Sequence, residues 1–257
     1  MTTCFLPNGG EFGWFLMGHV KRFQAFNDDK KVIICKENED VFFPSADEII
    51  FENYHVPDAD RMGSRHIFKD DRRRIQQKMR ELYGQDVVLV PPFGRHASMD
   101  VMHFSNTKMK FRPNRVGVKV DVVITPRQRD IIPERNFNGW DKIIKALKEE
   151  GLTVGAIGLK DTTLDLDLDV KSWEHIPNHT DIELLQNCKL CIALNSGCGL
   201  LSLITDTPTL MIHPEGVRSN PKQLKMMIDN HDNKFTYDES VWDDPDTIVK
   251  MAKCMIT

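Results

Sequence analysis

Residues 190–215 read LCIALNSGCGLLSLITDTPTLMIHPE, and this stretch decides the fold. Two apolar runs, at 190–194 and 209–212, enclose a Ser-Gly turn and a short leucine-rich segment. Short apolar runs that are bounded by Gly and Pro favour strands buried in a sheet. The stretch therefore predicts a strand, a turn, a short helix and a second strand, which together form one corner of a Rossmann-like domain.

The turn has the composition of an anion-binding site, with the residues Asn195, Ser196, Gly197, Cys198 and Gly199. Glycine allows a ligand to approach the backbone closely. The amides at the start of a helix and the positive end of the helix dipole attract phosphate, and the Ser196 hydroxyl adds a further donor. A plain strand-to-helix turn also favours Ser, Asn and Gly, so this simpler interpretation stays open beside the phosphate site.

The same turn approaches the dinucleotide-binding fingerprint. Gly197, Gly199 and Ser202 match the pattern G-x-G-x-x-S, and Glu215 follows the next strand, where an acid can bind ribose. Two features weaken this interpretation: the helix is short, and the fingerprint usually opens the first strand–helix unit of its domain. An NAD-linked oxidoreductase therefore remains one alternative function.

Apolar runs alternate with helical patterns along nearly the whole chain of 257 residues. Such alternation implies mainly parallel sheets that are covered by helices on both faces. The runs fall into two series, each too short for a large domain. We therefore expect an α/β protein with two Rossmann-like domains facing a cleft, residues 1–114 and 115–257. The join lies near 111–115, and the second domain opens with an expected strand at 116–125.

Composition and charge exclude several classes of protein. The formal net charge of -4 argues against a nucleic-acid binder, which usually has a strongly basic face. No apolar run approaches the roughly 20 residues of a transmembrane segment, and the first residues lack the features of a signal peptide, so we expect a cytoplasmic protein. Most of the six cysteines lie in apolar runs, which predicts buried, reduced thiols. Cys188 and Cys191 form a CxxC pair without the second ligand pair of a zinc site, and no metal site is predicted.

A glycine-rich loop at residues 8–14 forms the first expected strand-to-helix junction, with glycines at Gly9, Gly10 and Gly13. Glu11 lies in this loop, beside the expected start of the helix. A carboxylate at this place can act as a general base for a hydroxyl acceptor, or it can stabilise the helix start through the dipole alone. The sequence leaves both roles open.

Basic residues follow two other expected strands. Thr125 ends one of them and is followed by Arg127 and Arg129, whose guanidinium groups suit the oxygens of a diphosphate. A solvated loop explains these arginines equally well. Arg95 and His96 follow an earlier strand on the expected cleft side, where they can touch an acceptor, although an isolated His is more often structural.

The run TDIELLQNCKLCIALNSGCGLLSLITDTPTLMIHPEG, residues 180–216, resembles the C-terminal domain of GT-B glycosyltransferases, especially of the heptosyltransferase-like group (glycosyltransferase family 9). That group has a helix, an apolar strand, an Asp-Ser-Gly-type turn, a short helix, a Gly-Thr-Pro-Thr step and a final strand. In this chain NSG at 195–197 stands at the turn, and DTPT at 206–209 stands at the step. The loop with Glu11 is similar to the first loop of the group, where an acidic residue is proposed as the base.

The resemblance implies a glycosyltransferase that moves a sugar from a nucleotide-diphosphate sugar to a glycan or another hydroxyl acceptor, without a metal or other cofactor. Residues 1–114 would bind the acceptor and residues 115–257 the donor. The implied donor residues are Thr125, Arg127, Asn195, Ser196, Gly197, Cys198, Gly199 and Glu215. The implied acceptor-side residues are Gly9, Gly10, Gly13, Arg95 and His96, with Glu11 as the catalytic base. A nucleotide-sugar epimerase and a non-catalytic nucleotide-sugar-binding module remain as further alternatives.

Overall fold

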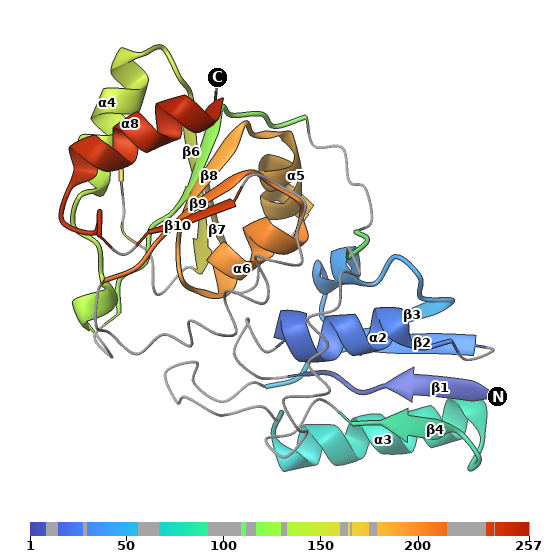
Figure 1. Cartoon of the computed structure of the whole chain (residues 1–257). Helices are drawn as coiled ribbons and strands as arrows, with labels where there is room; N and C mark the ends of the chain where they lie inside the picture. The colour runs from blue at the N-terminus through green and yellow to red at the C-terminus, as the bar shows by residue number, and fades with distance from the viewer. Residues whose placement is uncertain are drawn as a thin grey trace. The chain divides into compact units, whose positions relative to one another are not determined.

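The computed structural model describes residues 1–8, 15–27, 30–55, 67–91, 109–111, 117–129, 133–159, 164, 166–174, 179–214, 235–238 and 240–256. The chain divides into two compact units, which hold the described residues 1–111 and 117–256 (Figure 1). Each unit contains one sheet whose described strands all run parallel, as the alternating pattern predicts. Only Phe111 of the expected join at 111–115 is described, so the domain boundary stays a prediction.

The first unit is built around a four-stranded sheet of order β3-β2-β1-β4. Its elements are β1 (Thr2–Phe5), the π-helix η1 (Phe15–Val20), α2 (Lys21–Ala25), β2 (Lys30–Cys35), the 3-10 helix η2 (Glu39–Phe42), β3 (Glu48–Phe51), α3 (Lys69–Tyr83) and β4 (Val88–Val90). Asp70 and Asp71 stabilise the start of α3 through the helix dipole. The helix ends at Gly84, where a φ of 89° requires the freedom of glycine.

The two faces of this sheet bury different kinds of side chain. One face is mostly aliphatic and packs on α3, with Cys4, Leu6, Val32, Ile34, Ile75 and Met79 in its core. The other face is aromatic, and Phe5 packs edge-to-face on Phe23 of α2 with 4.9 Å between ring centres. His19 lies among these rings, and burial lowers its pKa to about 3, so it stays neutral at physiological pH.

The second unit contains a six-stranded sheet of order β10-β9-β8-β5-β6-β7. Its elements are β5 (Val122–Thr125), the 3-10 helix η4 (Pro133–Arg135), α4 (Trp140–Glu149), β6 (Val154–Leu159), β7 (Val170–Glu174), α5 (His179–Asn187), β8 (Leu190–Leu194), α6 (Gly197–Ile204), β9 (Thr209–Ile212), β10 (Phe235–Asp238) and α8 (Pro245–Ile256). Counted within the unit, this order is that of the doubly wound dinucleotide-binding fold.

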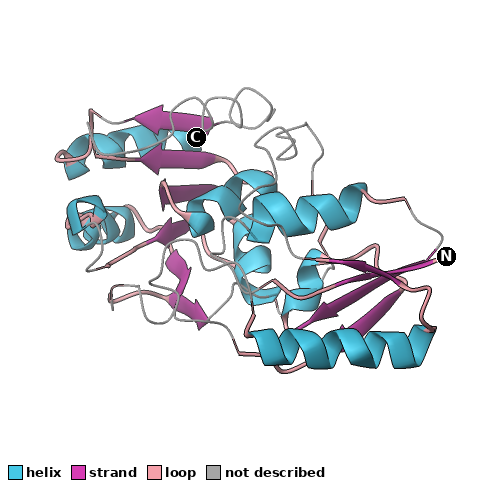
Figure 2. Cartoon of the chain, turned by 90° about the horizontal axis from the view of Figure 1, so that it is seen from below, coloured by secondary structure: helices cyan, strands magenta, loops and turns pink. Residues whose placement is uncertain are grey.

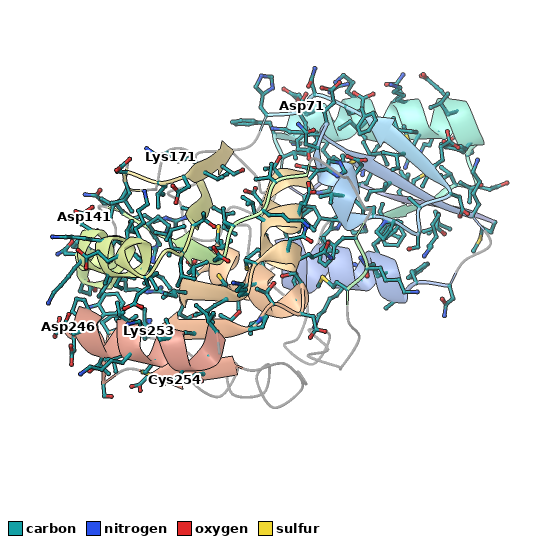
Figure 3. All side chains as sticks on the ribbon, turned by 90° about the horizontal axis from the view of Figure 1, so that it is seen from above. Asp71, Asp141, Lys171, Asp246, Lys253 and Cys254 are labelled. Carbon is teal, nitrogen blue, oxygen red and sulfur yellow. The ribbon has the colours of Figure 1, made fainter. Side chains whose placement is uncertain are left out.

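Helices cover both faces of this second sheet. In Figure 1, α4 and α8 lie on one face, whereas α5 and α6 lie on the other. Figure 2 shows the same layering, with helices on both sides of the strands. Trp140 of α4 is 1% exposed and packs in one core with Ile124 of β5 and Ile248 of α8. Surface pairs join the two helices as well: Lys142 contacts Asp246 at 2.9 Å, and Lys253, which Figure 3 labels with Asp246 on α8, contacts Glu150.

The cysteines confirm the prediction of buried, reduced thiols. All six are free, and all except Cys254 are buried. Burial raises the pKa of the Cys188 thiol to about 12 and that of the Cys191 thiol well above its usual value. These two thiols are therefore protonated and unreactive at physiological pH. None of the helices in the described parts of the chain is long and apolar enough to cross a membrane.

The expected strand at 116–125 is wrong in its first half. β5 begins only at Val122, and residues 117–120 are outside any strand. Gly117 has a φ of 78°, a conformation that strands do not contain. The prediction was too long because valines, which favour strands, also occur in the unpaired segment that precedes this strand.

Candidate functional site

The carboxyl ends of β5 and β8 form the topological switch point of the second sheet. β5 pairs with β8 on one side and with β6 on the other, and the strand order reverses between β5 and β8. Ligands of open α/β sheets bind outside the carboxyl ends of the strands at this point. The segments that leave this edge are 126–129 after β5 and 195–199 after β8, and the sequence predicted both as phosphate-binding loops.

Ser196 caps the helix that follows β8. Its backbone is extended, with φ −148° and ψ 176°, and its hydroxyl accepts a hydrogen bond from the amide of Gly199 at 3.3 Å. This is the geometry of a helix N-cap, which fixes the first turn of α6. None of the residues in that turn is acidic.

Gly199 allows α6 to pack directly on β8. A Cβ atom at this position would lie 2.1 Å from the carbonyl oxygen of Leu194 and 3.2 Å from Cε of Met211. The first distance is far below any real contact, so only glycine permits this close approach of helix and strand. The role matches that of the last glycine in dinucleotide fingerprints, where a helix also packs closely on its strand.

Thr125 joins the two central strands instead of pointing out of the sheet edge. The residue is 2% exposed, and its Oγ1 accepts a hydrogen bond from the amide of Leu194 at 3.0 Å. This bond continues the β5–β8 pairing beyond the last ladder bond. Thr125 was predicted to bind the donor, and the structure gives its hydroxyl a role in fixing the position of the loop that follows β8.

Two arginines from the β5 loop bring positive charge to the start of α6. Burial and the charge of Asp181 raise the pKa of the Cys198 thiol to about 12, although the charges of Arg129 and Arg127 lower it. Thr125 at the end of β5 pairs with Ala193 of β8, so the loop that carries the two arginines leaves the sheet beside the loop from which α6 starts. Nε of Arg129 is buried and, within the described residues, has no hydrogen-bond partner.

The segment 133–136 contacts both of these loops. Asn136 donates from Nδ2 to the carbonyl oxygen of Arg129 at 2.8 Å and accepts the Arg129 amide at Oδ1 at 2.9 Å. Arg135 donates from its guanidinium to the carbonyl oxygen of Asn195. No local sequence pattern marks the contact of Arg135, whose partner lies 60 positions away, or the contact of Asn136 with Arg129.

Buried hydroxyl groups support α6 from behind. The hydroxyl of Thr207 donates to the carbonyl of Leu185 at 2.8 Å, and the hydroxyls of Ser202 and Thr209 lie 3.0 Å apart. Asp206 has a φ of 63°, in the left-handed region that glycine adopts with least strain. This is the residue that aligns with Gly in the Gly-Thr-Pro-Thr step of the resembling group.

Seven of the predicted site residues lie outside the described residues: Gly9, Gly10, Glu11, Gly13, Arg95, His96 and Glu215. The structure does describe β1, the strand that precedes the glycine-rich loop with the first four of these residues. The strand order of the first sheet reverses between β1 and β4, so the chain after β1 starts at the switch point of that sheet. This agrees with an acceptor-side role for the glycine-rich loop, which stays a prediction.

A buried carboxylate that the sequence analysis missed follows β2. Glu39 is 3% exposed, and its Oε2 accepts hydrogen bonds from the Tyr54 hydroxyl at 2.9 Å and from the Lys36 amide at 3.0 Å. Lys36 Nζ lies 5.0 Å from the centre of the Tyr54 ring. Burial raises the pKa of Glu39 to about 7, and the two hydrogen bonds and the charge of Lys36 only partly oppose this shift.

The raised pKa of Glu39 predicts a pH-dependent stability. The folded state binds the proton of Glu39 more tightly than the unfolded state does. The stability that this proton contributes is therefore fully present below pH 4.5 and is lost as the pH rises through about 7. Glu39→Gln should remove that slope and stabilise the protein at pH 8 relative to wild type, by at most roughly 3 kcal/mol. Urea unfolding at pH 5 and pH 8 measures the difference, and Glu81→Gln on the exposed side of α3 is the control. Parallel slopes for wild type and Glu39→Gln would contradict the assignment.

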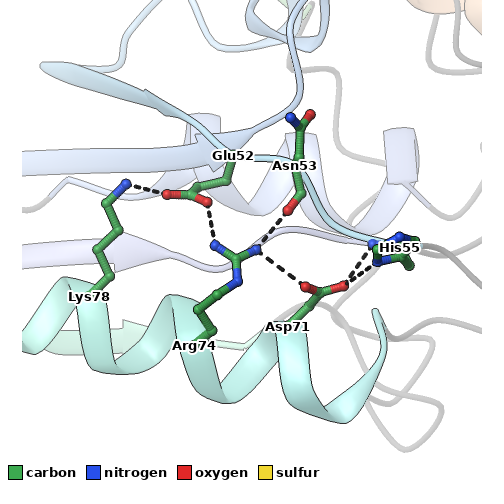
Figure 4. A network of polar contacts seen from close by, with 6 residues as sticks. All are labelled: Glu52, Asn53, His55, Asp71, Arg74 and Lys78. Atoms are coloured by element: carbon green, nitrogen blue, oxygen red, sulfur yellow. Dashed lines mark hydrogen bonds and ion pairs between the residues drawn. The ribbon is translucent and has the colours of Figure 1, made fainter.

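An ion-pair network anchors the segment that leaves β3 (Figure 4). Glu52 accepts from Arg74 at 2.7 Å and from Lys78, both on α3. Asp71 accepts a hydrogen bond from the backbone amide of His55 at 2.8 Å. This bond, with those from the His55 ring and Arg74, lowers the pKa of the Asp71 carboxyl to about 2. The network holds residues 52–55 against α3, and because Arg74 (48% exposed) and Lys78 (45% exposed) are open to solvent, it contributes little to stability.

Metal ligands are not gathered in the parts of the chain that are described. No group of three or more His, Cys, Asp or Glu side chains there is placed to hold a metal ion.

No protein-family model and no curated protein sequence matches this chain. Solved structures do match over nearly its full length. ADP-heptose LPS heptosyltransferase II of E. coli is 10% identical, with a TM-score of 0.63, over 100% of this chain and 98% of the other. A family 9 glycosyl transferase of Veillonella parvula is 10% identical, with a TM-score of 0.59, over 99% and 97%.

A third structure, the E. coli heptosyltransferase WaaC with ADP, is 10% identical, with a TM-score of 0.55, over 99% of this chain and 100% of the other. The chain therefore has the heptosyltransferase-like GT-B fold, which confirms the fold that the resemblance implies. At 10% identity the likeness establishes the fold alone.

Proposed function

We propose that this protein is a GT-B glycosyltransferase that moves a sugar from a nucleotide-diphosphate sugar to a hydroxyl group of an acceptor. The carboxyl edge of β5 and β8 carries the proposal, because the capped start of α6 follows β8 there and Arg127 and Arg129 follow the neighbouring strand β5. The dipole of α6 and two guanidinium groups together suit a diphosphate. WaaC, which shares the fold, was solved with ADP.

In the proposed reaction the acceptor oxygen attacks the anomeric carbon of the donor sugar. The bond between that carbon and the diphosphate oxygen breaks, and the nucleoside diphosphate leaves with the electron pair. Arg127, Arg129 and the start of α6 stabilise the negative charge that develops on the leaving group. Fixed positive groups thus take the part that a metal ion takes in other transferases, and the proposed reaction is independent of metal.

Glu11 is the proposed general base, which takes the proton of the acceptor hydroxyl as the oxygen attacks. The assignment rests on the sequence of the glycine-rich loop and on the place where the loop begins, which is the end of β1 at the switch point of the first sheet. The G-x-G-x-x-S alternative is less well supported, because its turn follows β8, the fourth strand of its unit, whereas the dinucleotide fingerprint follows the first.

Donor binding is testable without knowledge of the acceptor. A ligand that binds only the folded state stabilises it by mass action and so raises Tm. At a ligand concentration of a hundred times Kd, the free energy of unfolding rises by about 2.7 kcal/mol. We expect one class among ADP-, UDP- and GDP-linked sugars, with its free nucleoside diphosphate, to raise Tm. A panel without any shift, on a protein that unfolds cooperatively, contradicts the proposal.

Catalysis is tested with the donor that this panel identifies. Glu11→Gln should lower the rate of sugar transfer by at least about 100-fold, because a general base contributes that much or more, and should leave Kd for the nucleotide unchanged. Transfer should survive dialysis against EDTA. Full transfer by Glu11→Gln removes the proposed base, and conversion of the donor sugar without an acceptor identifies an epimerase instead.

A further inference from the structure

Residues 133–136 connect the two loops of the diphosphate site without belonging to either of them. The segment comprises η4 and Asn136, and the amide of Asn136 donates to the carbonyl of Pro133 at 2.9 Å, which closes the 3-10 turn. From this compact turn, two neighbouring side chains reach in different directions. Asn136 contacts the loop after β5, and Arg135 contacts the loop after β8.

Asn136 holds the backbone of Arg129 by two hydrogen bonds at once. Its amide group donates 2.8 Å to the carbonyl oxygen of Arg129 and accepts the amide of the same residue at 2.9 Å. A paired strand contacts its neighbour in the same way, with both main-chain groups satisfied. Because both polar groups of the Arg129 backbone are engaged, the direction in which its side chain leaves the loop is restricted.

Arg135 acts on the other loop through the residue before the helix cap. Its guanidinium donates to the carbonyl oxygen of Asn195, and Ser196 follows as the N-cap of α6. Hydrogen bonds from a charged donor are stronger than neutral ones. The contact therefore limits the rotation of the peptide from which α6 starts, and with it the direction of the first-turn amides.

We infer that Arg135 and Asn136 are positioning residues of the diphosphate site, which hold the Arg129 loop and the start of α6 in register with each other. The inference rests on the proposed function of the same edge. Neither residue needs to touch the ligand. Both lower the cost of ordering two loops at the moment of binding, which is how preorganisation increases affinity.

The test compares Asn136→Ala with Asn187→Ala. Asn187 lies at the end of α5 in the same unit, and its Nδ2 donates to the carbonyl of Glu183 at 2.8 Å, so both variants lose a bond from a side-chain amide to the backbone. Titration calorimetry measures Kd for pyrophosphate and for the nucleoside diphosphate that stabilises the wild type. Hydrogen exchange of the Arg129 amide reports whether the loop is released.

Asn136→Ala should speed exchange of the Arg129 amide and raise Kd for both probes about tenfold, which corresponds to about 1.4 kcal/mol. Asn187→Ala should leave Kd within about twofold, a difference of less than 0.5 kcal/mol. Arg135→Met should likewise raise Kd, and Arg135→Lys should restore part of it, because Lys keeps a charged donor.

Three results would overturn the inference. The first is an unchanged Kd in Asn136→Ala although the Arg129 amide exchanges faster, since the loop would then be loose without consequence. The second is an equal loss of affinity in Asn187→Ala, which would mean a general effect of stability. The third is a wild type that binds neither probe. A wild type that binds pyrophosphate but no nucleotide contradicts the proposed function alone, because the pyrophosphate comparison still decides the role of Asn136.

Discussion

Gly199→Ala is expected to destabilise the protein by about 3 kcal/mol or more, because the added methyl group overpacks a fixed site. Its Cβ would lie 2.1 Å from the carbonyl oxygen of Leu194. That oxygen belongs to the backbone of β8, which is paired on both sides with β5 and β9, so it cannot move away without disturbing the centre of the sheet. Met211 is flexible enough to adjust, whereas the strand is not.

Urea unfolding of the purified variants measures this effect, and Gly151→Ala is the matched control. Gly151 also lies in the second unit and has a φ of 78°, but a Cβ there meets no atom within 4 Å. Its substitution should therefore cost only the strain of the left-handed backbone, about 1 kcal/mol. If Gly199→Ala were no more destabilising than Gly151→Ala, the close contact of α6 and β8 would not be present in solution.

Arg129→Met is expected to weaken binding of the nucleoside diphosphate by about 100-fold, the equivalent of about 2.8 kcal/mol. The charge of Arg129 acts on Cys198 in the first turn of α6, and its buried Nε has no partner within the described residues. A phosphate oxygen at this place would accept a hydrogen bond from Nε and would pair its negative charge with the positive charge of the guanidinium. Met keeps the unbranched apolar stem of the side chain but removes the charge and all donors.

Calorimetry at two salt concentrations measures the loss and its origin. Arg129→Lys should recover only part of the affinity, since a point charge cannot form the two-pronged bond. Arg73→Met, on the exposed side of α3, removes one positive charge from the first unit and should leave Kd unchanged. An Arg129→Met protein that binds as tightly as wild type would show that the phosphates lie elsewhere.

The centre of the second sheet was predictable because its strands are apolar on both faces. The expected strands at 190–194 and 209–212 agree with β8 and β9 to the residue, and their side chains are buried throughout. A strand between two neighbours and two helix layers has no polar position, so it appears in the sequence as a continuous apolar run. Pro245 marks the start of the final helix, α8, because proline suits the first position of a helix.

The edge strands β7 and β10 were missed for the complementary reason. Their sequences are VKSWE and FTYD, which mix polar and apolar residues. Among the described strands, one neighbour pairs with each of them. Short mixed segments of this kind do not differ from surface loops in composition. The acidic segment DLDLD at 165–169 directly precedes β7 in the sequence.

The candidate site divides in the same manner. Arg127 and Ser196 follow apolar strands directly, so the rule that ligands bind at the carboxyl ends of strands was enough to identify them. Arg135, Asn136 and Glu39 have no comparable position. Their roles depend on which residues lie opposite them in space, and these contacts become visible only in the folded chain.

The hydrogen bond between Leu194 and Thr125 joins residues that are 69 positions apart in the chain. Closing so long a loop costs conformational entropy before any contact offsets it, and such distant pairings slow folding. Local helices such as α4 can form early, whereas the diphosphate site exists only after β5 and β8 have met. A fluorescent nucleotide that is added during refolding would therefore report when β5 and β8 have paired. Its signal should rise with the last steps of assembly, later than the recovery of helical circular dichroism.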